Sequence, residues 1–173
     1  ATPLGAGTPK IALLLPLSAS GSSGTAAVAL KNAAEMAMAD LSGAQIELIV
    51  KDEKGTPDGA REATKQALAE GARVIIGPLL AASVQSTSSI ARENGRPVIA
   101  FSTDIGVAGR GVYLLSFLPQ SDVDRILTYA VSKGKKSLAA LIPDTPYGNA
   151  VNSTLQTVAA RNGITIKAIE RYA

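Results

Sequence analysis

A strand–helix–strand pattern in the middle of the sequence constrains the fold more than any other feature. Residues 74–76 (Val-Ile-Ile) form a short apolar run that Pro78 ends, as in a strand buried on both faces of a sheet. Residues 81–94 carry a narrow apolar stripe at helical spacing, Gly95 is suited to end that helix, and residues 98–101 repeat the strand pattern. This order predicts a right-handed βαβ unit, and ligands bind open parallel sheets at the edge where the strands end.

The same alternation of strands and helices extends over residues 10–118. Further strands are predicted at residues 10–15, 46–50 and 112–117. Further helices are predicted at residues 26–41 and 57–70, with Thr56 capping the second of them and Pro57 in its first position. Three consecutive strand–helix–strand crossings indicate the α/β class, with a doubly wound parallel sheet covered by helices on both faces.

The pattern also predicts the division of the chain into domains. Residues 1–9 lack periodicity and read as a flexible leader, and residues 10–118 form the first α/β lobe. Beyond them we expect helices at residues 122–133 and 147–162 and strands at residues 137–142 and 164–169. Two short strands and two helices cannot cover both faces of a sheet. Residues 119–173 therefore read as the beginning of a second, incomplete α/β lobe.

Composition excludes several classes of function. The 173 residues include no cysteine and no histidine, which removes thiolate chemistry, the commonest general base and the commonest metal ligand. A hydrolase would need a Ser–Lys or carboxylate arrangement, and none stands out at a strand end, so we expect a protein that is not an enzyme and uses no cofactor or metal. The net charge of +3 comes from scattered Lys and Arg, which argues against nucleic-acid binding. No apolar run approaches the ~20 residues of a membrane span.

The loop at residues 18–25 (Ser-Ala-Ser-Gly-Ser-Ser-Gly-Thr) is a candidate anion site. It precedes a predicted helix N-terminus, where free N–H groups and the helix dipole favour a carboxylate or phosphate near Ser18, Ser22 and Ser23. The alternative is a flexible solvated turn, and both remain open. The loop lacks the pattern of a P-loop or a dinucleotide fingerprint. Asp52, at a strand end, is suited to bind a ribose if the protein takes a nucleotide.

Five segments in this order resemble a known family. They are residues 11–18 (Ile-Ala-Leu-Leu-Leu-Pro-Leu-Ser), 51–53 before Thr-Pro-Asp, 74–79 (Val-Ile-Ile-Gly-Pro-Leu), 96–102 (Arg-Pro-Val-Ile-Ala-Phe-Ser) and 144–149 (Asp-Thr-Pro-Tyr-Gly-Asn). Together they resemble the type I periplasmic solute-binding proteins, whose best-known members are receptors for branched-chain amino acids. Residues 13–18 (Leu-Leu-Leu-Pro-Leu-Ser) and residues 113–117 look closest to one branch of the family, the lipoprotein activators of penicillin-binding proteins.

The resemblance implies a function as well as a fold. It implies a non-catalytic receptor in which two hinged α/β lobes close on a small polar solute, amino-acid-like or peptide-like, for ABC-type uptake with a permease as partner. The expected location is the periplasm or cell envelope, which the protein reaches by export. A lipid anchor at the N-terminus that tethers it to the membrane is compatible with this location. The alternative is an envelope regulator with a degenerate cleft that docks on a peptidoglycan synthase. Family members are about twice this length, so this chain would be a fragment.

The resemblance also assigns ligand-binding residues. In amino-acid receptors of the family, the segment after the Gly-x-Leu turn offers serine hydroxyls and N–H groups to the ligand carboxylate, and the matching positions here include Ala81 and Ser83. The alanine in place of a hydroxyl weakens the case for a standard α-amino acid. The segment at Ser102, Thr103 and Asp104 would contact the ligand amine.

Three residues carry open alternatives. Tyr147 matches the second-lobe tyrosine that lies against the ligand in the family, and the alternative is packing on its own lobe. Arg110 is a candidate anion partner in a glycine-rich loop, and the alternative is a solvated side chain. Asp104 is as well suited to form a turn as to bind an ammonium group.

Overall fold

The computed structural model describes residues 8–41, 43 and 45–173. Residues 1–7 of the predicted leader lie outside this described part. The chain divides into two compact units, Ala1–Ser116 and Phe117–Ala173, and each is treated by itself below.

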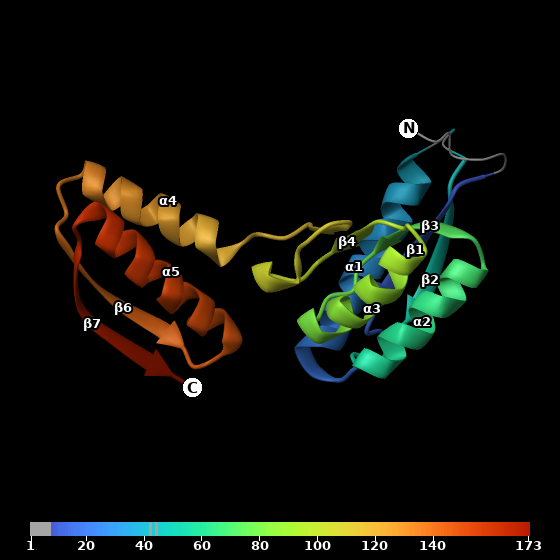
Figure 1. Cartoon of the computed structure of the whole chain (residues 1–173), viewed down its shortest axis with the longest axis horizontal. Helices are drawn as coiled ribbons and strands as arrows, with labels where there is room; N and C mark the ends of the chain where they lie inside the picture. The colour runs from blue at the N-terminus through green and yellow to red at the C-terminus, as the bar shows by residue number, and fades with distance from the viewer. Residues whose placement is uncertain (1–7, 42, 44) are drawn as a thin grey trace. The chain divides into compact units, whose positions relative to one another are not determined.

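The first unit is built on a five-stranded parallel sheet (Figure 1). Its order is β2-β1-β3-β4-β5, and the strands are β1 (Lys10–Leu15), β2 (Glu47–Asp52), β3 (Ala72–Ile76), β4 (Val98–Ala100) and β5 (Val112–Leu114). The helices are α1 (Gly21–Asp40), α2 (Pro57–Ala69), α3 (Ala81–Glu93) and the short 3-10 helix η1 (Ile105–Val107).

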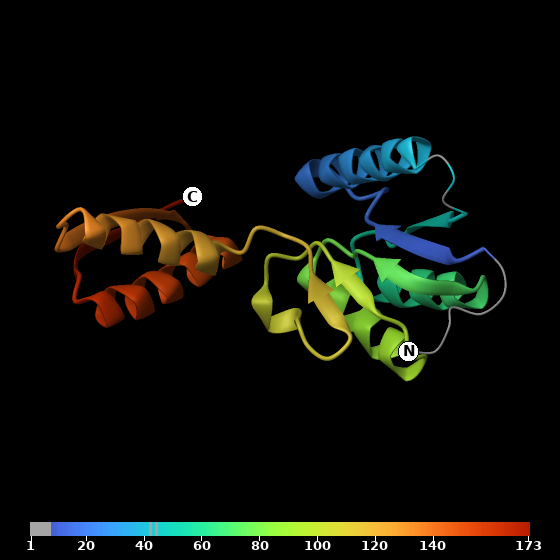
Figure 2. The same ribbon diagram turned by 90° about the horizontal axis from the view of Figure 1, so that it is seen from above.

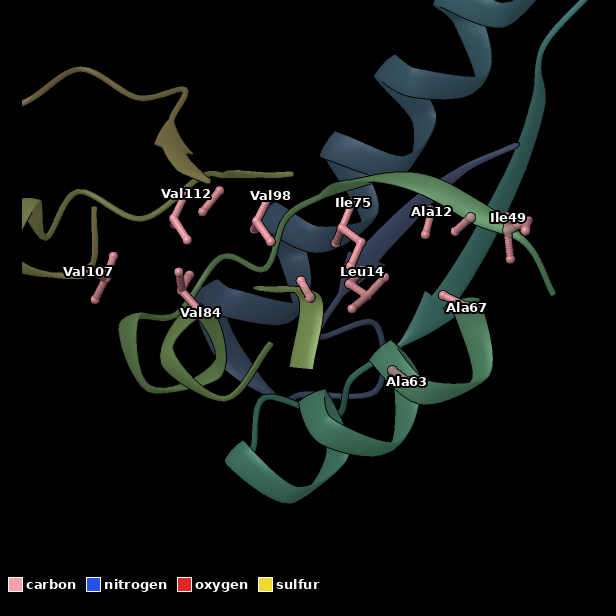
Figure 3. Close-up of a cluster of buried hydrophobic side chains, with 13 residues drawn as sticks. Ala12, Leu14, Ile49, Ala63, Ala67, Ile75, Val84, Val98, Val107 and Val112 are labelled. Atoms are coloured by element: carbon pink, nitrogen blue, oxygen red, sulfur yellow. The ribbon is translucent and has the colours of Figure 1, made fainter. Parts of the chain in front are cut away.

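Helices cover both faces of this sheet, which confirms the predicted doubly wound α/β fold. Figure 2 shows α1 on one face and α2 with α3 on the other. Leu13 and Leu15 of β1 pack with Ala27 on the α1 side, while Leu14 faces the opposite core. The side chains of that second core are small, and all except Leu14 belong to alanine, valine or isoleucine (Figure 3). The close approach of α2 to the sheet follows from Ala60, Ala63 and Ala67, because these alanines are fully or almost fully buried and add little thickness.

The start of α2 follows the predicted capping pattern. The Thr56 side chain accepts a hydrogen bond of 3.0 Å from the backbone N–H of Gly59, and Pro57 occupies the first helical position. At the far end of α3, Gly95 has a positive φ of 63°, as expected of the residue that terminates the helix.

Two boundaries of the first unit differ from the prediction by three residues or more. Helix α1 begins at Gly21 rather than at residue 26, because its first turn packs directly on the preceding loop. A Cβ on Gly24 would lie 1.9 Å from the carbonyl oxygen of Ala19, so only glycine permits this contact. The Gly/Ser composition therefore indicated a loop where tertiary packing forms a helix. Strand β5 ends at Leu114 rather than at residue 117.

The second unit has two helices on a two-stranded parallel sheet. Its elements are α4 (Pro119–Ser132), β6 (Ser137–Pro143), α5 (Pro146–Asn162) and β7 (Thr165–Tyr172). Helix α4 begins three residues before the predicted start, and β7 runs three residues past its predicted end because its whole length pairs with β6. One core joins both helices to the sheet, with Leu127, Leu155 and Ile142 among its residues.

Candidate functional site

The loops that carry most of the predicted site residues lie at one edge of the five-stranded sheet. Because β1 to β5 are parallel, the segments that follow them all emerge at the carboxyl edge. These segments contain Ser18 after β1, the start of α3 after β3, and Ser102 to Asp104 after β4. The edge therefore collects hydroxyls, carboxylates and helix N-termini from four connections.

Asp52 ties the first two connections together at this edge. Its Oδ1 accepts hydrogen bonds from the backbone N–H of Ser18 (3.3 Å) and of Lys54 (2.9 Å). Burial by itself would raise the pKa of Asp52, but the hydrogen bonds from Ser18, Lys54 and Leu17 outweigh it and lower the pKa. Asp52 is thus an ionised group that fixes the β1–α1 loop, and the neighbouring Ser18 side chain is exposed.

Ser22 and Ser23 lie in the first turn of α1, not in a loop before it. The residue before the helix, Ser20, makes no side-chain capping hydrogen bond. The first N–H groups of a helix have no partner within the helix, so this N-terminus presents uncapped donors beside the two serines.

The start of α3 has the same property. Leu80 occupies the capping position and its side chain has no hydrogen-bonding group, so no side chain caps the N–H groups of Ala81, Ala82 and Ser83. Ala82 is exposed and Ala81 half-buried, which leaves the backbone of this turn within reach of solvent. Of the three long helices in the first unit, only α2 has a side-chain cap within the described residues.

Ser83 itself points into the protein rather than toward solvent. Its side chain is 1% exposed, and its Oγ donates a hydrogen bond of 2.8 Å to Oε2 of Glu53, which is fully buried. A buried carboxyl needs a donor, and Ser83 supplies it. The hydroxyl is thereby used inside the fold, so a contact of Ser83 with a ligand would be made by its backbone N–H.

Glu53 is the residue at this edge that reasoning from the sequence did not single out. Its Oε1 is buried without a hydrogen-bond partner among the described residues. Burial raises the pKa of Glu53, and the nearby charge of Asp52 raises it further, while the Ser83 hydroxyl opposes the change. The Glu53–Ser83 contact spans 30 positions, and neither residue has a local pattern that indicates the other.

The turn after β4 uses two of its predicted site residues to hold its own shape. The Oγ of Ser102 accepts from the N–H of Asp104 at 3.1 Å, and Oδ1 of Asp104 accepts from the N–H of Gly106 at 2.8 Å. The Ser116 hydroxyl donates to the carbonyl oxygen of Ser102 at 2.7 Å. Thr103 is exposed and its side chain makes none of these bonds, so it is the freest hydroxyl of the turn.

Tyr147 lies in the second unit, in the first turn of α5. The Oγ1 of Thr145 caps this helix by accepting from the N–H of Gly148 at 3.2 Å, and the Tyr147 side chain is 51% exposed.

Across residues 8–41, 43 and 45–173, no helix is long and apolar enough to cross a membrane. Within those same ranges no group of acidic side chains is placed to hold a metal ion.

A family comparison covers almost the whole chain. The family model described as periplasmic binding protein matches residues 8–173. None of the curated proteins matches the sequence with significance.

Solved structures with this fold include receptors from several bacteria. An ABC transporter substrate-binding protein from Sphaerobacter thermophilus has a TM-score of 0.79 and 19% identity, over 95% of this chain and 47% of that one. A solute-binding protein from Rhodopseudomonas palustris BisB5, in complex with 3,4-dihydroxybenzoic acid, has a TM-score of 0.74 and 19% identity, over 94% and 47%. A leucine-binding protein from Thermotoga maritima MSB8 has a TM-score of 0.68 and 21% identity, over 94% and 49%.

These identities are low, so the likeness to the solved structures establishes the fold, and this chain spans about half the length of each. The family match rests on the sequence and extends from residue 8 to residue 173. Together with the order of the five parallel strands, it shows that this chain belongs to the periplasmic binding proteins, with the fold of the type I members.

Proposed function

We propose that this chain is part of a non-catalytic receptor that binds a small, carboxylate-bearing solute at the carboxyl edge of the five-stranded sheet, for ABC-type uptake. One observation carries the proposal: the N-termini of α1 and α3 open at this edge without side-chain caps. Uncapped N–H groups and the positive end of the helix dipole bind carboxylates.

The ligands of related structures support a carboxylate as the recognised group. Three Rhodopseudomonas palustris proteins with this fold are in complexes with 3,4-dihydroxybenzoic acid, benzoate and 4-hydroxybenzoate, and the Thermotoga maritima protein is a leucine-binding protein. These compounds differ in ring, chain and amine, and they share one carboxylate. We infer that a small organic acid, amino-acid-like or aromatic, is the class of solute for this receptor.

The roles of individual residues follow from their positions. The backbone N–H groups of Ala81, Ala82 and Ser83 would bind the carboxylate, with the Ser22 and Ser23 turn as the second donor set. Thr103 would supply a hydroxyl to the rest of the ligand, and Tyr147 is assigned to ligand contact by the family resemblance. The family description, periplasmic binding protein, supports a location in the periplasm or cell envelope. The ABC transporter solute-binding proteins with this fold support an ABC permease as the partner.

The test is a ligand screen with a variant that removes one N–H group. Thermal-shift measurements on refolded protein, with leucine, benzoate and hydroxybenzoates, should show stabilisation of roughly 2.7 kcal/mol at 100 times the dissociation constant. Ala81→Pro deletes the N–H of Ala81 but suits the first helical position, because Leu80 already has an extended φ and ψ of −90° and 138°.

We expect the free energy of unfolding of Ala81→Pro to lie within about 1 kcal/mol of that of the parent chain. The variant should bind the organic acid about tenfold more weakly, because one hydrogen bond to a charged group is lost. Binding that is unchanged in Ala81→Pro would contradict the assigned site. The absence of any shift with every organic acid would contradict the receptor proposal and favour the envelope-regulator alternative.

A further inference from the structure

The opposite, amino edge of the same sheet contains a pocket lined by three arginines. The pocket has a volume of about 380 Å³ and is formed by Arg92, Gly95, Arg96, Pro97, Arg110 and Gly111. It joins the end of α3 to the two turns that lead into β4 and β5. We call it the arginine pocket.

Backbone hydrogen bonds hold the three arginine positions together. The N–H of Arg96 donates to the carbonyl oxygen of Ala91 (2.8 Å) and that of Gly95 to Arg92 (3.0 Å), which is the hydrogen-bond pattern of a helix-terminating motif. The N–H of Val98 donates to the carbonyl oxygen of Gly111 at 2.8 Å, so the turn with Arg110 lies beside the turn with Arg96. The pocket is therefore fixed by main-chain geometry.

Among the residues that the structure describes, no acidic side chain forms an ion pair with any of the three guanidinium groups. Arg61, Arg161 and Arg171 each form an ion pair with an aspartate. In the described part of the chain, Arg92, Arg96 and Arg110 form no such pair, and Glu93, next to Arg92 in α3, is exposed and forms none with them. Three positive charges around one pocket repel one another unless an anion lies between them. The partial negative charge at the end of α3, about half an electron, offsets only part of this.

Arginine geometry and charge indicate the kind of anion. Guanidinium groups bind oxygen atoms of phosphate in a planar, two-point manner, and a phosphate monoester carries about two negative charges and three acceptor oxygens. A pocket of about 380 Å³ is within the size range of small-molecule sites. The backbone N–H groups of Gly95 and Arg96 are already used, so they are not available to a ligand, and the three guanidinium groups are the charged donors of the pocket.

We infer that the arginine pocket binds the phosphate group of a small soluble molecule, at a site separate from the solute site at the carboxyl edge. The separation follows from the parallel sheet, since residues 95–97 and 110–111 precede β4 and β5 whereas the solute site follows β3 and β4. This inference stands independently of the proposed receptor function.

The experiment is a calorimetric titration of the full chain with pyrophosphate at low ionic strength. The expected result is saturable binding that weakens about tenfold in Arg96→Gln and in Arg110→Gln, as for loss of a hydrogen bond to a charged group. Arg125→Gln is the matched control, because Arg125 is an exposed arginine on α4 and its loss removes the same charge. Unfolding curves of all three variants confirm that each is folded.

Four results would contradict the inference or part of it. Equal weakening in Arg125→Gln would overturn the inference, because it would mean diffuse attraction by net charge, and so would the absence of saturation. Displacement of pyrophosphate by benzoate at the same concentration would overturn the phosphate assignment. Sedimentation with phosphatidylglycerol vesicles that is lost in Arg96→Gln would overturn the assignment to a soluble molecule, because a lipid headgroup would then be the source of the phosphate.

Discussion

The two edges of the five-stranded sheet are built in different ways. At the carboxyl edge, acidic side chains are engaged: Asp52 accepts from two backbone N–H groups, Glu53 from Ser83, and Asp104 from Gly106. At the amino edge, the backbone N–H groups of Gly95 and Arg96 and the carbonyl oxygen of Gly111 are paired, and the three arginine side chains of the pocket form no ion pair within the described residues. At the carboxyl edge, side chains fix the shape, and backbone N–H groups remain for a ligand. At the amino edge, backbone hydrogen bonds fix the shape, and arginine side chains remain for a ligand.

The largest difference between the edges is expected for glycine substitutions. A Cβ on Gly77, at the carboxyl edge, would lie 2.1 Å from the carbonyl oxygen of Leu14, and its φ is +88°. Gly111, at the amino edge, has a φ of +80° but nothing within 4 Å of such a Cβ. We expect Gly77→Ala to lower the free energy of unfolding by about 3 kcal/mol or more, and Gly111→Ala by about 1 kcal/mol. Urea unfolding measures both, and equal losses would show that the two edges are packed alike.

The buried Glu53 provides the next largest effect. Ser83→Ala removes the hydroxyl that donates to Oε2 of Glu53 and leaves the carboxyl buried without that donor. We expect a loss of about 2 kcal/mol at neutral pH. The double variant Glu53→Gln with Ser83→Ala should recover part of this loss, because the charge is gone. If the double variant loses more than Ser83→Ala alone, the contact does not have the role assigned to it.

The pH dependence of stability should have opposite signs for the two adjacent acids. The raised pKa of Glu53 means that its contribution is fully present below the ordinary value of 4.5 and is lost as the pH rises through the folded-state value. The lowered pKa of Asp52 means that its contribution is present above the ordinary value of 3.8 and is lost as the pH falls through the folded-state value. Gln and Asn stay neutral, so in unfolding curves from pH 2 to 7 the difference of each variant from the parent chain should grow toward pH 7, with Glu53→Gln gaining stability relative to the parent and Asp52→Asn losing it.

The smallest effect is expected at the arginine pocket. Arg96→Gln removes an exposed side chain without an ion pair in the described structure, so stability should change by no more than about 0.5 kcal/mol. The sign should be stabilising at low salt, since like charges are separated, and the gain should disappear at about 1 M salt. A loss of more than about 1 kcal/mol would indicate that Arg96 supports the fold, which would weaken the inference of a free anion site.

The fold was predictable because its signals are local. Short apolar strands, the Thr56–Pro57 helix start and the glycine at 95 are readable from a few neighbouring residues, and each is confirmed in the structure. The start of α1 was not readable, because it depends on the contact of Gly24 with Ala19, which a loop-like Gly/Ser composition conceals.

The sites were less predictable because they depend on contacts between distant residues. The burial of Ser83 follows from Glu53, 30 positions earlier, and the arginine pocket combines the end of α3 with a turn before β5. The glycine-rich loop indicates Arg110 as an anion partner, but Arg92 and Arg96 give no local signal. The ligand-binding roles of Ser18, Ser22, Ser23, Ala81, Ser83, Ser102, Thr103, Asp104 and Tyr147 stay predictions.

The central claim is that the carboxyl edge binds a carboxylate through uncapped helix N-termini. The most direct measurement is an amide NMR titration of the full chain with benzoate and leucine. Saturable shifts should appear at the N–H groups of Ser22, Ala82, Ser83 and Thr103, and those of Gly95 and Gly111 should stay unchanged. Shifts confined to the amino edge, or none at the first turns of α1 and α3 at saturating ligand, would contradict the account.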